Sequence, residues 1–157
     1  MSGILTNTGA VMRWKARFRD AWARLDAGLS LLDQDETAWA PDDGVPCAVD
    51  RLRTIVASES DLGARMSGGL AAPAGAKPGE PFGFAALLGR HHRTRRVLLN
   101  WLESARDQDL GSASGRACVE ELFYRHLVVL VAETTAIIEL ARLIDPTRLV
   151  DFDTCQR

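Results

Sequence analysis

The sequence lacks the cysteine patterns of disulfide-stabilised, zinc-binding and redox-motif proteins. Its three cysteines, Cys47, Cys118 and Cys155, lie far apart and form no Cys-x-x-Cys pair and no Cys/His ligand spacing. An odd number of widely separated cysteines is typical of free thiols in a reducing compartment. We therefore expect a cytoplasmic protein whose thiols are free.

The sequence also lacks a long apolar run. The longest aliphatic stretch, residues 127–132, is bounded by His126 and Glu133, and it is far shorter than the roughly 20 apolar residues that cross a bilayer as a helix. The first seven residues have neither the basic nor the apolar region of a secretion signal. We expect no membrane association and no export by a standard signal.

Neither sign of charge dominates the composition. The chain has 19 basic and 21 acidic residues and a formal net charge of −2, so no overall field favours nucleic acid or an anionic membrane surface. Arginine outnumbers lysine 17 to 2. We interpret this bias as the codon usage of a GC-rich, bacterial genome, without bearing on function.

Known catalytic motifs and strand patterns are missing as well. The sequence contains no Gly-x-Ser-x-Gly elbow, no Walker loop and no dinucleotide-binding fingerprint. No stretch alternates cleanly between apolar and polar residues, and no Asn-Gly or Asp-Gly joins two β-branched runs. These absences argue against the common nucleotide-binding and hydrolase folds and against a β protein.

What the sequence does contain is four segments with apolar residues at three- and four-residue steps, the pattern of amphipathic helices. We predict helices from about Gly9 to Asp33, Val45 to Met66, Phe82 to Gln108, and Ser112 or Ser114 to Ile144. A Gly/Pro/Ala-rich stretch, residues 67–81, cannot continue a helix and is predicted to be a flexible crossover. The expected fold is a single all-α domain over residues 1–157, an antiparallel bundle of four principal helices.

Four ionisable residues fall on the apolar stripes of these predicted helices: Glu59, His91, His126 and Glu133. A buried charge or imidazole is costly unless it is hydrogen-bonded, paired or bound to a metal. Carboxylates and imidazoles from facing helices build metal centres in four-helix bundles, and these donors suit iron, manganese or zinc. His126 and Glu133 are seven residues apart, roughly 10 Å along a helix, so neighbouring helices would have to complete any site.

Two other interpretations of these four residues stay open. The first is a buried network in which the histidines bind the carboxylates and fix the register of the bundle without any chemistry. The second is an error of one position in a helix boundary, which moves a residue off its stripe. The sequence has no Glu-x-x-His, His-x-x-x-His or His-x-x-x-Glu pair on one helix face, so the metal hypothesis depends on residue types alone.

A basic patch, residues 90–96, contains four arginines, of which Arg93 and Arg96 are predicted to share the outward helix face. One interpretation is a binding surface for a protein partner. Another is that these arginines pair with the acidic region 33–43, and such exposed pairs contribute little stability. Nucleic-acid binding is disfavoured because no helix-turn-helix pattern and no interleaved aromatic residues accompany the patch.

The function expected from these observations is that of a small cytoplasmic, non-enzymatic accessory, adaptor or regulatory protein that binds another protein. This expectation follows from the missing catalytic motifs and the charged patches. The alternative is a metal-binding four-helix bundle, with iron, manganese or zinc in a buried His/Glu site and a redox or sensing role.

Overall fold

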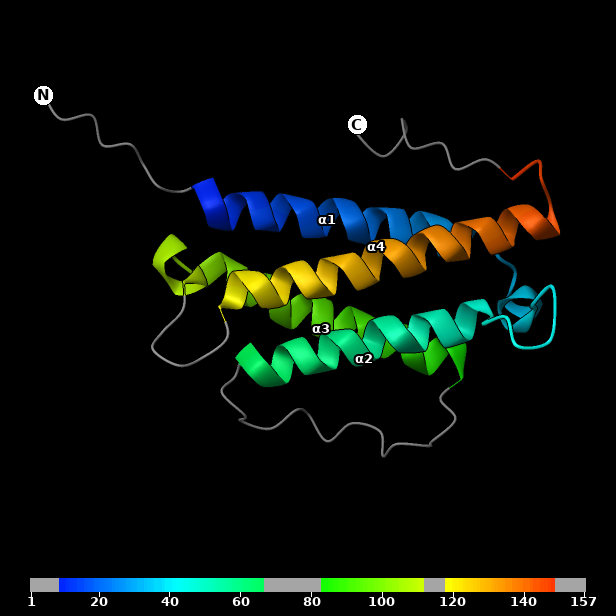
Figure 1. Ribbon diagram of the computed structural model, residues 1–157, viewed down its shortest axis with the longest axis horizontal. Coiled ribbons are helices and arrows are strands. Elements are labelled where there is room, and N and C mark those ends of the chain that lie inside the picture. Colours follow the sequence, from blue (N-terminus) through cyan, green and yellow to red (C-terminus); the bar gives the residue numbers. More distant parts are fainter. Residues whose placement is uncertain (1–8, 67–82, 112–117, 149–157) are drawn as a thin grey trace, which may run out of the picture.

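The described residues of the protein form a bundle of four α-helices (Figure 1). The computed structural model describes residues 9–66, 83–111 and 118–148. In these residues there is no strand, and two short 3-10 helices follow the first and third long helices. The elements are α1 (Gly9–Ser30), η1 (Gln34–Ala38), α2 (Ala48–Met66), α3 (Phe84–Ser104), η2 (Asp107–Leu110) and α4 (Val119–Ile144). The predicted all-α bundle is confirmed.

The four helices run in two directions. Figure 1 shows α1 and α4 running one way, and α2 and α3 running the other way. Helix α2 packs against both α3 and α4, and α1 packs against α4. Consecutive helices are therefore antiparallel at the first and last connections, whereas α2 and α3 are parallel. Parallel neighbours need a connection that leads from one end of the bundle to the other. The predicted crossover, residues 67–81, lies between α2 and α3 in the sequence, as this topology requires. It lies outside the described residues.

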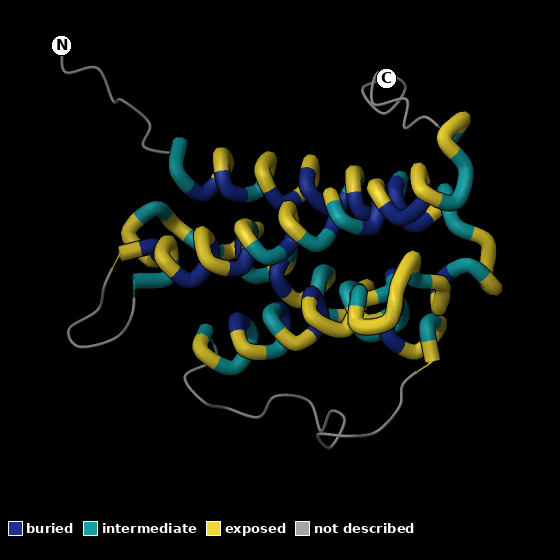
Figure 2. The backbone as a smooth tube through the Cα atoms, turned by 45° about the vertical axis from the view of Figure 1, so that its right-hand side comes forward, coloured by how far each residue is buried: buried dark blue, intermediate teal, exposed yellow. Residues whose placement is uncertain are grey.

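The interior consists of the predicted apolar stripes (Figure 2). The apolar residues at three- and four-residue steps along α1 are buried: Val11, Trp14, Phe18, Trp22, Leu25 and Leu29. Phe18 and Phe123 meet edge to face, with ring centroids 5.3 Å apart, a preferred geometry for aromatic pairs. This aromatic packing joins the two parallel outer helices, α1 and α4.

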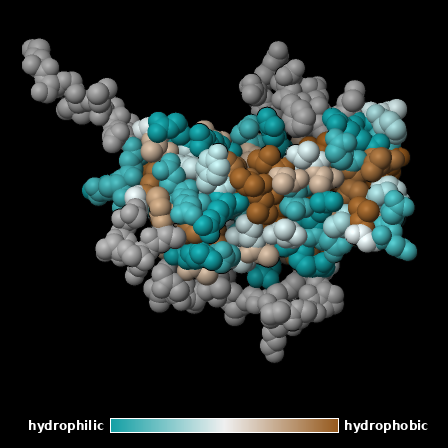
Figure 3. All heavy atoms as spheres, in the orientation of Figure 1, coloured by the Kyte–Doolittle hydropathy of each residue, from teal (hydrophilic) through white to brown (hydrophobic). Residues whose placement is uncertain are grey.

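Helix α4 is apolar on more than its inward face. Figure 3 shows apolar side chains among hydrophilic ones on the face that includes α4, and exposed apolar residues on this helix include Val128, Val131 and Leu143. Even so, no helix within the described ranges has the length and apolar content needed to cross a bilayer.

The helix boundaries differ from the predicted ones at both ends of the bundle. Helix α3 ends at Ser104 because the backbone of Ala105 is extended, and η2 follows. Asp107 of η2 then accepts hydrogen bonds from the backbone N–H groups of Ala10 (3.3 Å) and Val11 (2.9 Å). A carboxylate at this position satisfies free N–H groups and complements the positive end of the α1 dipole. Residues 112–117, at the predicted start of the last helix, lie outside the described part of the chain.

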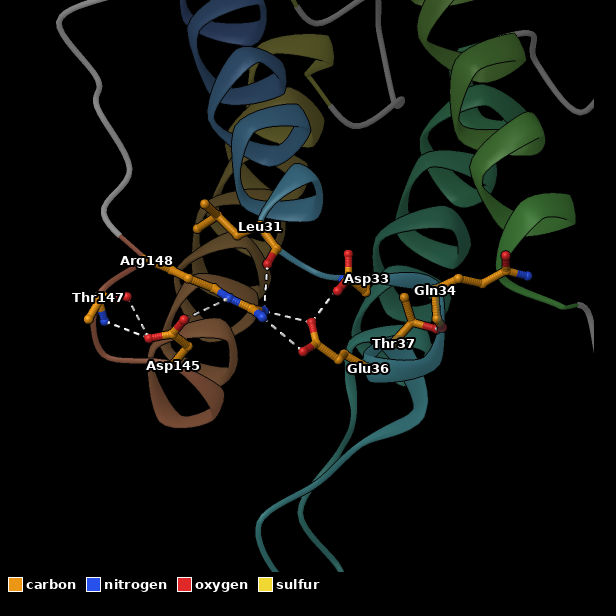
Figure 4. Close-up of polar contacts among 8 residues, drawn as sticks. All are labelled: Leu31, Asp33, Gln34, Glu36, Thr37, Asp145, Thr147 and Arg148. Carbon is orange, nitrogen blue, oxygen red and sulfur yellow. Dashed lines mark hydrogen bonds and ion pairs between the residues drawn. The ribbon is translucent and has the colours of Figure 1, made fainter.

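At the opposite end, Arg148 fastens the end of α4 to the segment after α1 (Figure 4). Its guanidinium donates to both carboxylate oxygens of Glu36, at 2.6 and 2.9 Å, and to the carbonyl oxygen of Leu31 at 2.8 Å. Asp145 lies 3.6 Å from its Nε. This Arg148 cluster holds the two chain segments together with a two-pronged arginine–carboxylate contact.

Candidate functional site

Three of the four ionisable residues predicted to face the core are fully buried at mid-bundle. Glu59 on α2 is 2% exposed, His91 on α3 is 0% exposed, and His126 on α4 is 2% exposed. Each is on the inward stripe of its helix, so the packing of α2 between α3 and α4 brings their side chains together. We call these three residues the buried triad.

Both imidazoles of the buried triad are held by adjacent residues of α2. His91 Nδ1 is 2.7 Å from Glu59 Oε1, and His126 Nδ1 is 2.9 Å from Ser58 Oγ. His126 Nε2 lies 3.9 Å from Glu59 Oε1, too far for a hydrogen bond. Ser58 was missed by the sequence analysis because it lies off the apolar stripe and is only half-buried. Its position directly before Glu59 is the only sequence signal for it.

Each member of the buried triad retains one polar atom without a partner. These atoms are Glu59 Oε2, His91 Nε2 and His126 Nε2, all buried and without a hydrogen bond. A buried polar atom without a partner costs about 1–3 kcal/mol. Three such atoms in one network call for an explanation other than stability.

The low-dielectric surroundings favour the uncharged forms of Glu59 and His126. Burial raises the pKa of Glu59, and attraction to His91 and Arg95 offsets only part of this. Burial, with a smaller contribution from the nearby His91, lowers the pKa of His126 to about 4. The Phe18 ring stacks beside the His126 imidazole, with centroids 5.9 Å apart. His126 is therefore neutral at pH 7, with one ring nitrogen carrying a lone pair.

Glu133 is not part of this cluster. It is on α4 two helical turns from His126, its side chain is 21% exposed, and its Oε2 accepts a hydrogen bond from Arg51 of α2 at 3.0 Å. The seven-residue spacing keeps Glu133 on roughly the same side of the helix but at a different level. An arginine on the neighbouring helix satisfies it there, so the structure does not bring Glu133 to the other three predicted ligands.

The donor types of the buried triad fit a transition metal, whereas their present arrangement is that of a hydrogen-bonded network. Two imidazoles and one carboxylate are a ligand set used for iron, manganese and zinc. In the part of the chain that the structure describes, no three His, Cys, Asp or Glu side chains are grouped as metal ligands. Glu59 Oε1 is committed to His91, which leaves Oε2 as the free carboxylate oxygen.

The basic patch on α3 is at the surface. Arg93 and Arg96 are both exposed, as the helical periodicity predicts. Arg95 of the same patch pairs with Asp26 of α1 at 2.8 Å, and Glu36 of the acidic region 33–43 pairs with Arg148. The binding of a partner by Arg93 and Arg96 stays a prediction.

The chain matches one protein family, described as the DinB superfamily, over residues 17–133. The matched stretch contains all three residues of the buried triad and covers well over half of the chain. No curated protein and no solved structure matches the sequence. Proteins of this superfamily are typically metal-binding helical bundles and include enzyme-like members.

The expectation of a non-enzymatic adaptor or regulatory protein is therefore wrong. It relied on missing motifs, and the family match points instead to the alternative, a bundle with a buried metal site. The absence of motifs was a poor guide because a short sequence motif can only describe ligands that lie on one segment. The buried triad takes one residue from each of three helices. From the extent of the match, the chain belongs to the DinB superfamily.

Proposed function

We propose that this protein binds a divalent transition-metal ion, iron, manganese or zinc, through Glu59, His91 and His126. The observation that carries the proposal is that the two imidazoles are bound in the same way. Each is held through Nδ1 by a residue of α2, and each keeps a buried Nε2 without a partner. Metal-ligating histidines almost always donate their other ring N–H to a carboxylate or another oxygen.

The two hydrogen bonds are consistent with the tautomer that metal binding requires. When His91 Nδ1–H donates to Glu59 and His126 Nδ1–H donates to the Ser58 hydroxyl oxygen, both Nε2 atoms present lone pairs. Ser58 and Glu59 then fix the ring orientations, and Glu59 Oε2 is the remaining oxygen donor. Ser58 is a positioning residue in this arrangement.

The electrostatics of the site also favour a cation. A buried carboxylate with one unpartnered oxygen gains from a nearby positive charge, and a neutral His126 needs no proton removed before it binds a metal. A bound zinc ion would supply Lewis acidity, and iron or manganese would add redox chemistry. The redox or sensing role expected for the metal-binding alternative belongs to this proposal.

The competing candidate is a purely structural network, favoured by the 2.7 Å contact between His91 and Glu59. Metal content separates the two. The full chain is stripped with a chelator, reloaded with Fe(II), Mn(II) or Zn(II) in turn, desalted and analysed for metal. We expect one ion per chain in the wild type, and loss of the ion in His91→Ala and in His126→Ala.

His92→Ala is the matched control, because His92 is exposed and directly follows His91; this variant keeps the metal. A specific ion also raises the free energy of unfolding, by about 2.7 kcal/mol at a free metal concentration 100 times the dissociation constant. Equal metal contents in His91→Ala and His92→Ala, or no retained metal in the wild type, would overturn the proposal and leave the structural network.

A cytoplasmic location is proposed on separate grounds. Among the described residues, Cys47 and Cys118 are both free thiols, as expected in a reducing compartment.

A further inference from the structure

An apolar cavity of about 120 Å³ lies between α2 and α3, beside the buried triad. Its walls include Trp22 of α1, Leu62 of α2, and Leu98 and Trp101 of α3, and Glu59 also lines it. A dry apolar cavity of about 150 Å³ accommodates benzene. The volume and the two indole walls therefore match a single aromatic ring.

Glu59 is the acidic residue among those that line this cavity. Its Oε1 is taken by His91, so Oε2, which is buried and without a hydrogen bond, is the carboxylate oxygen left for a ligand. Thr94, the uncharged polar residue of the wall, donates its hydroxyl to the carbonyl oxygen of Arg90 at 3.0 Å. The other charged residue of the wall, Arg95, is already engaged: it pairs with Asp26 at 2.8 Å and lies 5.0 Å over the Trp22 ring. A carboxylate oxygen accepts hydrogen bonds, so a fitting ligand carries a donor.

Gly63 is a position at which this cavity can be filled by substitution. It is in the last turn of α2. A Cβ built on Gly63 meets no atom within 4 Å, and the residue lines the cavity. Packing therefore does not require glycine at this position, whereas a larger side chain would project into the cavity region.

We propose that this cavity binds a small one-ring aromatic molecule with one hydrogen-bond donor, such as a phenol, whose ring lies between the indole walls and whose donor contacts Glu59 Oε2. The proposal goes beyond the metal site and shares one atom with it, Glu59 Oε2. An aromatic carboxylate is disfavoured because its anion would lose water against apolar walls and brings no hydrogen-bond donor to Glu59.

The test uses the full chain after removal of metal by a chelator, with phenol, toluene and benzoate as probes. Trp22 and Trp101 line the cavity, so tryptophan fluorescence reports binding and calorimetry gives the stoichiometry. We expect saturable binding of one phenol, and binding of toluene weaker by about fivefold, the usual worth of one hydrogen bond. Benzoate is expected to bind more weakly than phenol. Glu59→Gln should reduce the preference for phenol over toluene.

Gly63→Leu fills the cavity region and should abolish phenol binding. Gly89→Leu is the matched control, because it adds the same side chain to α3 away from the cavity lining, and it should bind phenol as the wild type does. Absence of phenol binding, equal binding of phenol by the two leucine variants, or stronger binding of benzoate than of phenol would overturn the proposal. Because the probes are applied without metal, such a failure is distinct from failure of the metal titration.

Discussion

The buried triad and the Arg148 cluster are both polar, and both join helices far apart in sequence, yet they differ in how completely their atoms are bonded. Glu59 and His91 are 2% and 0% exposed, and three atoms of the buried triad have no partner. Arg148 and Glu36 have side chains 23% and 22% exposed, and every contact is a direct hydrogen bond or ion pair.

This difference separates a structural contact from a candidate site. Water solvates the remaining polar atoms of the Arg148 cluster, so its stability does not require a ligand, and it lowers the pKa of Glu36 through the hydrogen bond from Arg148. The buried triad has no such access to solvent, so its unpartnered atoms remain a cost until something binds them. A buried network with unpartnered polar atoms is thus a better guide to function than a fully bonded network near the surface.

The largest effect is expected from His91→Ala in the metal-free protein. Removing the imidazole leaves Glu59 buried without its hydrogen-bond partner, which costs about 1–3 kcal/mol, and the cavity left by the ring adds to this loss. Urea denaturation measures this loss. A cost close to that of an exposed substitution such as His92→Ala would show that the buried triad is more hydrated than its burial indicates.

A smaller loss is expected from Arg148→Ala. The substitution removes the contacts to Glu36 and Leu31, but the groups left behind can be solvated. The urea midpoint should fall by much less than in His91→Ala, and the metal content should stay at the wild-type value. Loss of metal in Arg148→Ala would mean that the end of the bundle is coupled to its middle, and the contrast between the two clusters would fail.

Glu133→Gln sharpens the boundary of the candidate site. Glu133 pairs with Arg51 and has no contact with the buried triad, so we expect a loss of at most about 1 kcal/mol and unchanged metal binding. The measurement is metal analysis beside a urea titration. A metal-free Glu133→Gln protein would return Glu133 to the ligand set predicted from the sequence.

The smallest effect concerns pH. The Arg148 hydrogen bond lowers the pKa of Glu36 below 4.5 in the folded state, so the unfolded state binds the proton more readily. The stabilisation is present above pH 4.5 and is lost as pH falls through the folded-state pKa. The stability difference between wild type and Glu36→Gln should therefore shrink between pH 6 and pH 3. A difference independent of pH would show that the carboxylate charge contributes nothing to this contact.

Much of the fold was predictable because helical periodicity is a local property. The spacing of Val11, Trp14, Phe18 and Trp22 predicts which side of α1 is buried, and the same rule placed Glu59, His91 and His126 inside. The boundaries were less predictable, because caps are tertiary: the N–H groups at the start of α1 are bound by Asp107, almost a hundred residues later.

The sequence by itself determined four amphipathic helices and three ionisable residues on their inward faces, because a period of 3.6 residues decides which side chains leave water. Only the tertiary structure decided that α2 and α3 run parallel and that Ser58 and Glu59 each hold one imidazole. It also decided that Glu133 pairs with Arg51 and does not join the buried triad. These outcomes depend on the level at which side chains of different helices meet. That level is set by the packing of whole helices against one another, which no single segment encodes.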